Sequence, residues 1–187
     1  MKDATILIAH PDDETIFMWW ALQQAKTIVC CSSDLNNPER QWCKDRKKAL
    51  VEIGAMVGAE VRCLDYPSEF YKANARDGSL SRLVKEVLAL LPERDICTHN
   101  PWGEYGHLDH ILVHQIARAS GKRLIYSGMC IDAGWLPCTP WRSLPIPERY
   151  CVNDISFYEK CKAIYDKYGC WTWSKDPIMS ARIYVAN

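Results

Sequence analysis

The sequence predicts an α/β fold in which helices cover both faces of a mostly parallel sheet. Short apolar segments rich in β-formers alternate along the chain with amphipathic segments, which is typical of parallel strands joined by crossover helices. The first segment, residues 5–9, is a continuous apolar run of the kind buried on both faces. The chain has 187 residues, of which 48% are hydrophobic, and is long enough to form a core. We expect one domain over residues 1–187.

The expected strands are short apolar runs bounded by polar residues, glycine or proline. They cover residues 5–9, 27–31, 60–64, 95–99, 123–127 and 181–185. Two loops are expected to shape the mouth of a pocket. The first, residues 67–77, carries Phe70 and Tyr71, and the second is the proline-rich segment 130–150, whose residues 134–147 form a loop or lid.

The expected helices carry apolar residues three and four positions apart, so that one face is apolar. They cover residues 14–24, 39–57, 80–91, 107–119 and 155–167. Asp12 or Asp13 would cap the first helix, because a side-chain oxygen at that position accepts a free backbone N–H. Gly58 fits the end of the second helix, where glycine adopts the left-handed conformation most easily.

Composition narrows the class of partner. Lys and Arg together equal Asp and Glu, so the net charge is zero and no basic excess indicates nucleic acid. A neutral or mildly polar small molecule is the expected partner. No run approaches the ~18 apolar residues of a membrane span, and the first strand is too short for the apolar part of a signal peptide. Ten cysteines without a C-x-x-C pair predict a cytoplasmic protein with mostly reduced, buried thiols.

Two of the expected strands end in polar clusters. The first runs into His10-Pro-Asp-Asp-Glu, and the fourth ends at His99-Asn100 and leads to His107. Because ligands bind at the carboxyl ends of strands in open α/β sheets, we expect both clusters to meet in one cleft.

The residue types in these clusters suit metal-assisted hydrolysis. His10 and Asp13 lie three apart across a turn, while His107, His110 and His114 share one helix face. Two histidines and an aspartate are a frequent set of catalytic zinc ligands, with water in the open position. Zinc lowers the pKa of that water toward ~7, and a neighbouring free carboxylate such as Asp12 can accept its proton.

Structural explanations exist for the same residues. The acids at 12–14 would also stabilise a helix N-terminus, where the helix dipole favours negative charge. His107 and His110 taken alone would be ordinary exposed helix residues. His99 fits a structural or supporting place, and His114 fits packing or orientation better than metal binding.

The motifs AHPDDE at 9–14 and GHLDH at 106–110 resemble those of the PIG-L/LmbE-like zinc N-deacetylases. The resemblance covers roughly residues 4–170 and includes the loop HNPWGEYGHLDH and the late segment KCKAIYDKY. It implies a Rossmann-like three-layer sandwich and hydrolysis of an acetamide on a sugar, often N-acetylglucosamine linked to another group.

The resemblance also implies a role for each matching residue. Zinc would be held by His10, Asp13 and His110. Asp12 would be the general base, and His107 the acid or electrostatic stabiliser with Asp109 orienting it. Tyr105 is placed to reach the oxyanion, Arg46 matches a substrate-contacting arginine, and Glu14 would support the loop.

Two departures from the family pattern leave the substrate open. Ala49 stands where a glutamate is usual three residues after Arg46, and Gly169-Cys170 replaces a frequent serine-glutamine pair. The expected function is a zinc-dependent deacetylase of an N-acetylglucosamine-type sugar or conjugate. The alternatives are an N-acyl hydrolase of an antibiotic, thiol conjugate or nucleotide-linked sugar, and a noncatalytic sugar- or metal-binding module.

Overall fold

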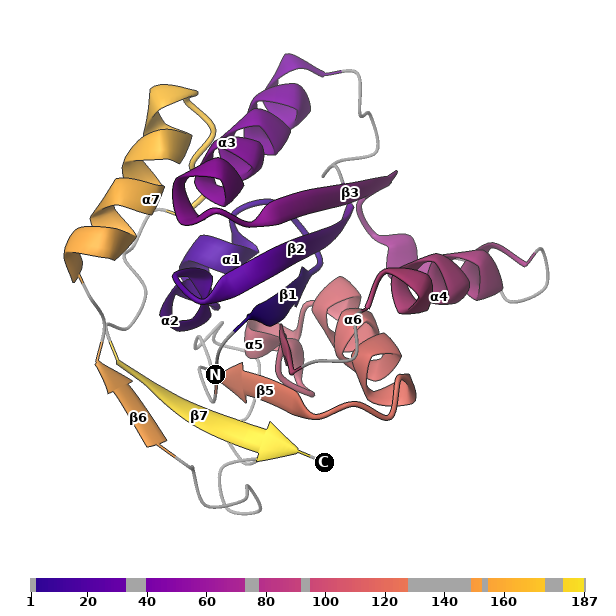
Figure 1. Ribbon diagram of the computed structural model, residues 1–187. Coiled ribbons are helices and arrows are strands. Elements are labelled where there is room, and N and C mark those ends of the chain that lie inside the picture. Colours follow the sequence, from indigo (N-terminus) through magenta and orange to yellow (C-terminus); the bar gives the residue numbers. More distant parts are fainter. Residues whose placement is uncertain are drawn as a thin grey trace.

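The described strands form a single seven-stranded sheet. The computed structural model describes residues 3–32, 40–72, 78–91, 95–127, 149–152, 155–173 and 180–186. The strands are β1 (Ala4–Ile8), β2 (Ala25–Ser32), β3 (Glu60–Tyr66), β4 (Ile96–Thr98), β5 (Leu124–Ser127), β6 (Arg149–Val152) and β7 (Ser180–Ala186). Their order in the sheet is β3-β2-β1-β4-β5-β7-β6 (Figure 1). Neighbours from β3 to β5 pair in parallel, whereas β7 runs antiparallel to β5 and β6. The predicted mostly parallel α/β fold is confirmed.

Helices cover both faces of the parallel part of the sheet. They are α1 (Asp13–Ile16), α2 (Trp19–Leu22), α3 (Gln41–Val57), α4 (Ser79–Leu90), α5 (Gly103–Gly106), α6 (Leu108–Ala119) and α7 (Ile155–Lys167). The helices α1, α2, α3 and α7 lie on one face, and α4 and α6 on the other (Figure 1). In β1, Ile6 and Ile8 pack into the core of the first face, and Leu7 packs into that of the second. A strand buried on both faces explains the continuous apolar run.

The predicted helix over residues 14–24 is two short helices. The chain breaks at Phe17 and Met18, where Met18 has φ −120° and ψ 9°. The indole Nε1 of Trp20 donates to the carbonyl oxygen of Phe17 at 2.9 Å. At the break, a side chain therefore donates to a carbonyl that a continuous helix would use for its own backbone hydrogen bonds.

The other predicted helices agree with the structure to within about two residues, the usual uncertainty of helix ends. Gly58 ends α3 in the left-handed conformation with φ 72°, as expected. Three described elements were not predicted: β6, α5 and the 3-10 helix η1 (Phe70–Lys72) in the expected first loop. The expected lid over residues 134–147 lies outside the described residues.

The sheet brings the two polar clusters to one edge. Leu7 of β1 pairs in register with Thr98 of β4, and the two strands run in the same direction. The turn after β1 and the loop after β4 therefore leave the sheet side by side. This arrangement confirms the expectation as far as the position of the clusters goes, because both follow strands that end at the same edge of the sheet.

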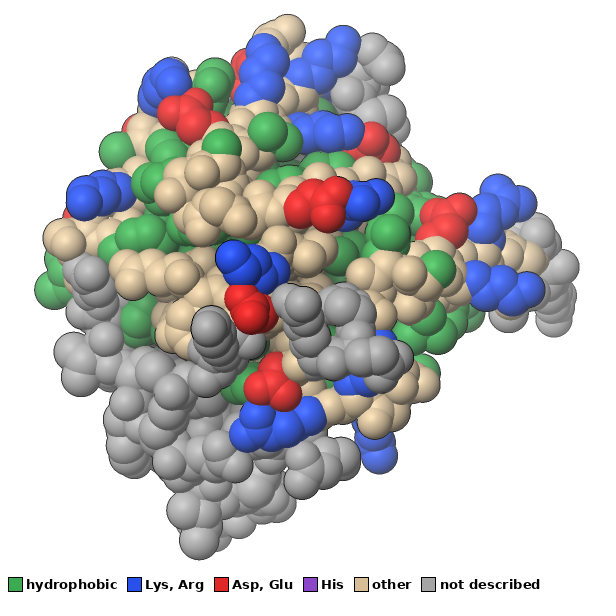
Figure 2. Space-filling view, in the orientation of Figure 1, with side chains coloured by type: hydrophobic (Ala, Val, Ile, Leu, Met, Phe, Trp, Pro, Cys, Tyr) green, Lys and Arg blue, Asp and Glu red, His purple; other side chains and the backbone are tan. Residues whose placement is uncertain are grey.

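No described helix combines the length and the apolar character that crossing a bilayer requires. Figure 2 shows acidic and basic side chains interspersed over the described part of one face, with no extended patch of one sign.

Candidate metal centre and active site

The turn after β1 is organised by its own acids. A carboxylate oxygen of Asp13, Oδ2, accepts the backbone N–H of His10 at 2.8 Å, and Glu14 Oε2 accepts that of Asp12 at 3.0 Å. Asp12 adopts a left-handed conformation with φ 92°, and its side chain makes no capping bond to α1. Glu14 Oε1 also accepts from the hydroxyl of Tyr165 in α7 at 2.8 Å, so Glu14 supports the loop as expected.

The loop after β4 is organised by a fully buried glutamate, Glu104. Its Oε1 accepts the backbone N–H of Asn100 at 2.9 Å. Its Oε2 lies 3.0 Å from Nδ1 of His99 and 2.8 Å from Nδ1 of His110. Burial alone would raise the pKa of Glu104, but the two imidazoles outweigh it and lower the pKa to about 2. The loop therefore holds an ionised carboxylate against two histidine rings.

The three expected metal ligands lie next to one another. His10 Nδ1 is 3.5 Å from Asp13 Oδ2, and His110 Nε2 is 3.5 Å from Asp13 Oδ1. His110 Nε2 is buried and has no hydrogen-bond partner. Burial lowers the pKa of His110 to about 4, which favours the neutral ring that a metal needs. Two imidazole nitrogens and a carboxylate oxygen are a donor set that fits a catalytic metal ion.

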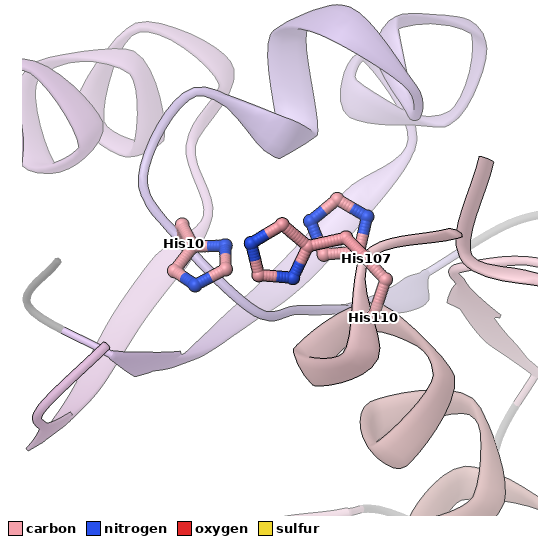
Figure 3. A group of neighbouring side chains, drawn as sticks. All are labelled: His10, His107 and His110. Atoms are coloured by element: carbon pink, nitrogen blue, oxygen red, sulfur yellow. The ribbon is translucent and has the colours of Figure 1, made fainter. Parts of the chain in front are cut away.

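Other histidines surround the same point. The described residues contain two groups whose ligand-capable atoms lie within 4.8 Å of one another: His10, His107 and His110, and Asp13, His99 and His110. Figure 3 shows the first group, with His10 approaching from the turn after β1 and His107 and His110 from the start of α6. The hydrogen bonds of each ring decide which nitrogen can bind a metal.

Neither His99 nor His107 keeps a suitable lone pair free. His99 Nε2 lies 3.3 Å from Asp13 Oδ2, but it accepts the backbone N–H of Ala9 at 3.0 Å, so that nitrogen already has a donor. His107 Nδ1 accepts the backbone N–H of Asp109 at 3.2 Å at the start of α6. Burial lowers the pKa of His107, and a neutral ring with Nδ1 as acceptor carries its proton on Nε2. His107 is therefore arranged as a donor and His99 as a support.

The carboxylate of Asp109 contacts His10, not His107 as expected. Its Oδ2 lies 3.1 Å from His10 Nε2, and it also accepts the backbone N–H groups of Glu69 and Tyr71, both at 2.8 Å. These two donors come from the segment around η1 and draw the carboxylate away from His107. A carboxylate on Nε2 places the ring proton there and leaves Nδ1 of His10 facing Asp13.

Asp12 is held by two side chains from distant parts of the chain. A guanidinium nitrogen of Arg46, in α3, lies 2.6 Å from Asp12 Oδ1 and also donates to the carbonyl of Pro11. The hydroxyl of Thr172 donates to Asp12 Oδ2. Burial raises the pKa of Asp12 to about 6, although Arg46 opposes this shift. A carboxylate in this range can accept a proton near neutral pH.

An aromatic cluster borders the site. The ring of Tyr105 lies 5.6 Å from those of both His107 and Trp173, and Trp173 packs edge-on against Phe17 at 5.8 Å, measured between ring centroids. Tyr105 and Trp173 are both half-buried. Apolar and aromatic walls with a few polar groups are typical of small-molecule sites.

The structure brings most of the predicted site residues together at this edge. They are His10, Asp12, Asp13, Tyr105, His107, Asp109 and His110. Arg46 lies there too, but it is 3% exposed and directed at Asp12, so here it holds a carboxylate instead of facing an open substrate site.

Two participants, Glu104 and Thr172, were not predicted. For Glu104 the sequence does carry a signal, an acid between two glycines in a loop that joins two histidine-bearing segments. Thr172 has no local signal, because 160 positions separate it from Asp12.

The chain belongs to the PIG-L family. The family described as GlcNAc-PI de-N-acetylase matches residues 5–120, which include β1, the turn after it and the start of α6. A 1D-myo-inositol 2-acetamido-2-deoxy-alpha-D-glucopyranoside deacetylase from Saccharomonospora viridis is 30% identical over 151 residues, covering 62% of this chain and 56% of the relative. The chain thus spans little more than half the length of that relative.

Solved structures share the fold. The N,N'-diacetylchitobiose deacetylase of Pyrococcus horikoshii superimposes with a TM-score of 0.61 at 15% identity, covering 91% of this chain and 71% of that one. The 4-carboxy-2-hydroxymuconate hydratase of Pseudomonas putida superimposes with a TM-score of 0.55 at 14% identity, covering 100% of this chain and 97% of that one. At these identities the likeness concerns the fold, which serves both deacetylation and hydration in those two proteins.

Proposed function

We propose that the protein is a zinc-dependent hydrolase that removes the N-acetyl group from an N-acetylglucosamine-type sugar or sugar conjugate. The observation that carries this proposal is the buried Nε2 of His110, which has no hydrogen-bond partner and faces Asp13. His10, Asp13 and His110 would hold the metal. The family match and the named deacetylases among its relatives support the reaction type.

The chemistry that zinc supplies at such a site is Lewis acidity, which polarises an amide carbonyl and makes water more acidic. Asp12 accepts the proton of the attacking water, because it lies beside Asp13 in the same turn and its raised pKa suits a base. Arg46 and Thr172 each occupy one carboxylate oxygen of Asp12 and so fix its direction.

His107 and Tyr105 act on the other side of the reacting amide. His107 directs its Nε2–H toward the developing negative charge, since its Nδ1 is engaged by the start of α6. Tyr105 borders the same place and offers a hydroxyl donor. The leaving amine needs a proton, which Asp12 returns after it has accepted one from water.

The aromatic side chains beside the site support the proposed substrate class, and the cysteines support the proposed compartment. The half-buried aromatic side chains Tyr105 and Trp173 suit a small molecule with apolar ring faces, such as a sugar. Six of the seven cysteines whose side chains are described are buried, and none of the seven forms a disulfide. Free thiols support a reducing compartment, so we place the enzyme in the cytoplasm.

Acetate release by the zinc-loaded protein tests the proposal. The substrates are an N-acetylglucosaminyl inositol, diacetylchitobiose and simpler N-acetylated amines, and the variant is Asp12→Asn. We expect wild type to release acetate and Asp12→Asn to lower kcat by ~10²–10⁴-fold with zinc content unchanged, since general-base catalysis has this size. The matched control is Asp65→Asn, which removes an exposed carboxylate of β3 that pairs with Lys47 of α3.

Bound zinc without turnover of any N-acyl substrate, together with unchanged behaviour of Asp12→Asn, would contradict the deacetylase. In that case water addition to an unsaturated carboxylic acid, the reaction class named for the hydratase of the same fold, is the next activity to assay.

A further inference from the structure

One carboxylate oxygen serves two histidines in the loop after β4. Glu104 Oε2 contacts Nδ1 of both His99 and His110, at 3.0 and 2.8 Å, and all three side chains are fully buried. The His99 and His110 rings stack with 3.9 Å between their centroids. The two imidazoles thus lie side by side on one acceptor.

The shared acceptor fixes the proton position on both rings. An ionised carboxylate only accepts hydrogen bonds, so each Nδ1 must carry a proton and each Nε2 must present a lone pair in the neutral ring. Both Nε2 atoms lie near the carboxylate of Asp13, at 3.3 Å for His99 and 3.5 Å for His110. They differ in that His99 Nε2 accepts the backbone N–H of Ala9 just after β1, whereas His110 Nε2 has no hydrogen-bond partner.

The same contacts join the two halves of the metal site. Ala9 immediately precedes His10, and His110 lies in α6. Through His99, Glu104 links the end of β1 to the start of α6. His114, one turn further along α6, donates from Nδ1 to the carbonyl of His99 at 2.7 Å. The spacing between the ligand-bearing segments therefore depends on this buried chain of bonds.

The backbone of Glu104 supports a specific role for its side chain. Its φ is 57°, a conformation that residues with a Cβ rarely adopt. Glycine would adopt it with less strain, as do Gly103 and Gly106 on either side. A strained glutamate among glycines indicates that the carboxylate itself is required at this position.

We propose that Glu104 is a positioning residue of the metal centre, which sets the tautomer of His110 and locks the end of β1 to α6. This inference rests on the proposed metal-dependent function. Glu104 touches no reacting atom, and acts by presenting His110 Nε2 to the metal as a lone pair.

Glutamine at this position cannot satisfy all the partners. With its amide oxygen toward Asn100, the NH₂ group faces two Nδ1 atoms and drives the ring proton of His110 onto Nε2, where it blocks metal binding. With the oxygen toward the rings, the NH₂ group faces the backbone N–H of Asn100, and two donors oppose each other in a buried place. Glu104→Gln therefore keeps the shape of the side chain but cannot make the same set of hydrogen bonds.

The test compares zinc and cobalt(II) affinities, thermal midpoints and imidazole nitrogen NMR spectra of wild type, Glu104→Gln and Glu104→Gly. Glu104→Gly relieves the backbone strain and so keeps the comparison valid if the glutamine variant does not fold. Asn100→Ala is the matched control, because it removes the acceptor of the Glu104 N–H, at 2.9 Å, and leaves the carboxylate on both rings.

We expect both Glu104 variants to bind zinc and cobalt(II) ~10–100-fold more weakly, as partners of metal-bound histidines do when changed. We also expect the NMR signals of His110 to show that its Nε2 is the lone-pair nitrogen in metal-free wild type and not in Glu104→Gln. Asn100→Ala should lower the thermal midpoint and leave zinc affinity within about threefold of wild type.

Unchanged zinc affinity in both Glu104 variants, with a lower thermal midpoint alone, would overturn the proposal and leave Glu104 a loop-stabilising residue. Zinc binding by wild type that Glu104→Gln weakens, without any acetate release, would contradict the proposed deacetylase and support the role of Glu104. A wild type that binds neither metal would overturn both.

Discussion

The turn after β1 and the loop after β4 both place acids beside histidines, but the acids point in opposite directions. In the turn, Asp12 and Asp13 direct their carboxylates toward the site, where one meets Arg46 and the other His110. In the loop, the carboxylate of Glu104 lies behind the histidine rings. The first segment therefore carries groups that would react or bind metal, and the second fixes the orientation of such groups.

Two histidines at the start of the same helix, α6, therefore have different roles. His110 keeps a lone pair directed at Asp13, whereas His107 has Nδ1 engaged by the backbone of Asp109. The carboxylate behind His110 leaves its Nε2 as a lone pair with no hydrogen-bond partner, and the backbone N–H behind His107 leaves its Nε2 as a donor. The spacing of His107 and His110 in the sequence does not show which of them binds a metal. The hydrogen-bond partner behind each ring makes that distinction.

The largest expected effect comes from replacing each of these two histidines separately by glutamine. His110→Gln should weaken zinc binding by more than ~100-fold, beyond the loss typical of supporting residues, and abolish acetate release. His107→Gln should keep zinc affinity within about threefold of wild type and lower kcat by ~10²-fold or more. Zinc titration against a coloured chelator measures the first quantity. Equal loss of zinc affinity in both variants would make His107 a ligand and break the comparison.

The next effect concerns the buried pair that holds Asp12. Arg46→Met should lower the free energy of unfolding by about 3–5 kcal/mol, because it leaves a buried carboxylate without its cation. The control Arg62→Met removes an exposed arginine that pairs with Glu60 on β3 and should cost at most about 1 kcal/mol. Urea unfolding of the metal-free proteins measures both. Similar values for the two variants would show that Asp12 does not depend on Arg46.

The smallest effect concerns the carboxylate behind His10. Asp109→Asn should weaken zinc binding by ~10–100-fold, as expected for a residue that orients a ligand ring. It should leave the His107 ring in place, because the backbone N–H of residue 109 remains. Zinc affinity and the His107 NMR signals check the two parts. An altered His107 with normal zinc affinity would restore the role that the sequence predicted for Asp109.

Local patterns were sufficient for the parallel part of the fold. Strand β1 is buried on both faces and reads as an apolar run, and α3 ends at a glycine with positive φ. The spacing of apolar residues did not predict the break between α1 and α2, where the indole of Trp20 donates to the carbonyl of Phe17. Among the described strands, β6 pairs with β7 alone, and its four residues carry little signal of their own.

In the candidate site too, local patterns predicted one part and long-range contacts determined the rest. His10, Asp13 and His110 follow from motif spacing and from the edge of the sheet where two strands end. The orientation of each side chain depends on residues that the spacing does not reveal. Asp109 turns to His10 because backbone donors near η1 attract it, and Thr172 reaches Asp12 from beyond α7. Contacts between segments far apart in sequence decided these cases.

The most direct test of the proposed metal centre is a crystal structure of the zinc-loaded protein with anomalous data collected at the zinc edge. We expect one zinc ion at ~2.0–2.2 Å from Nδ1 of His10, an oxygen of Asp13 and Nε2 of His110, the usual zinc–ligand distances. His107 would lie beside the ion without binding it, and Glu104 would keep its contact with His110. A zinc ion bound by His107 in place of Asp13, or no zinc at this edge of the sheet, would contradict the account.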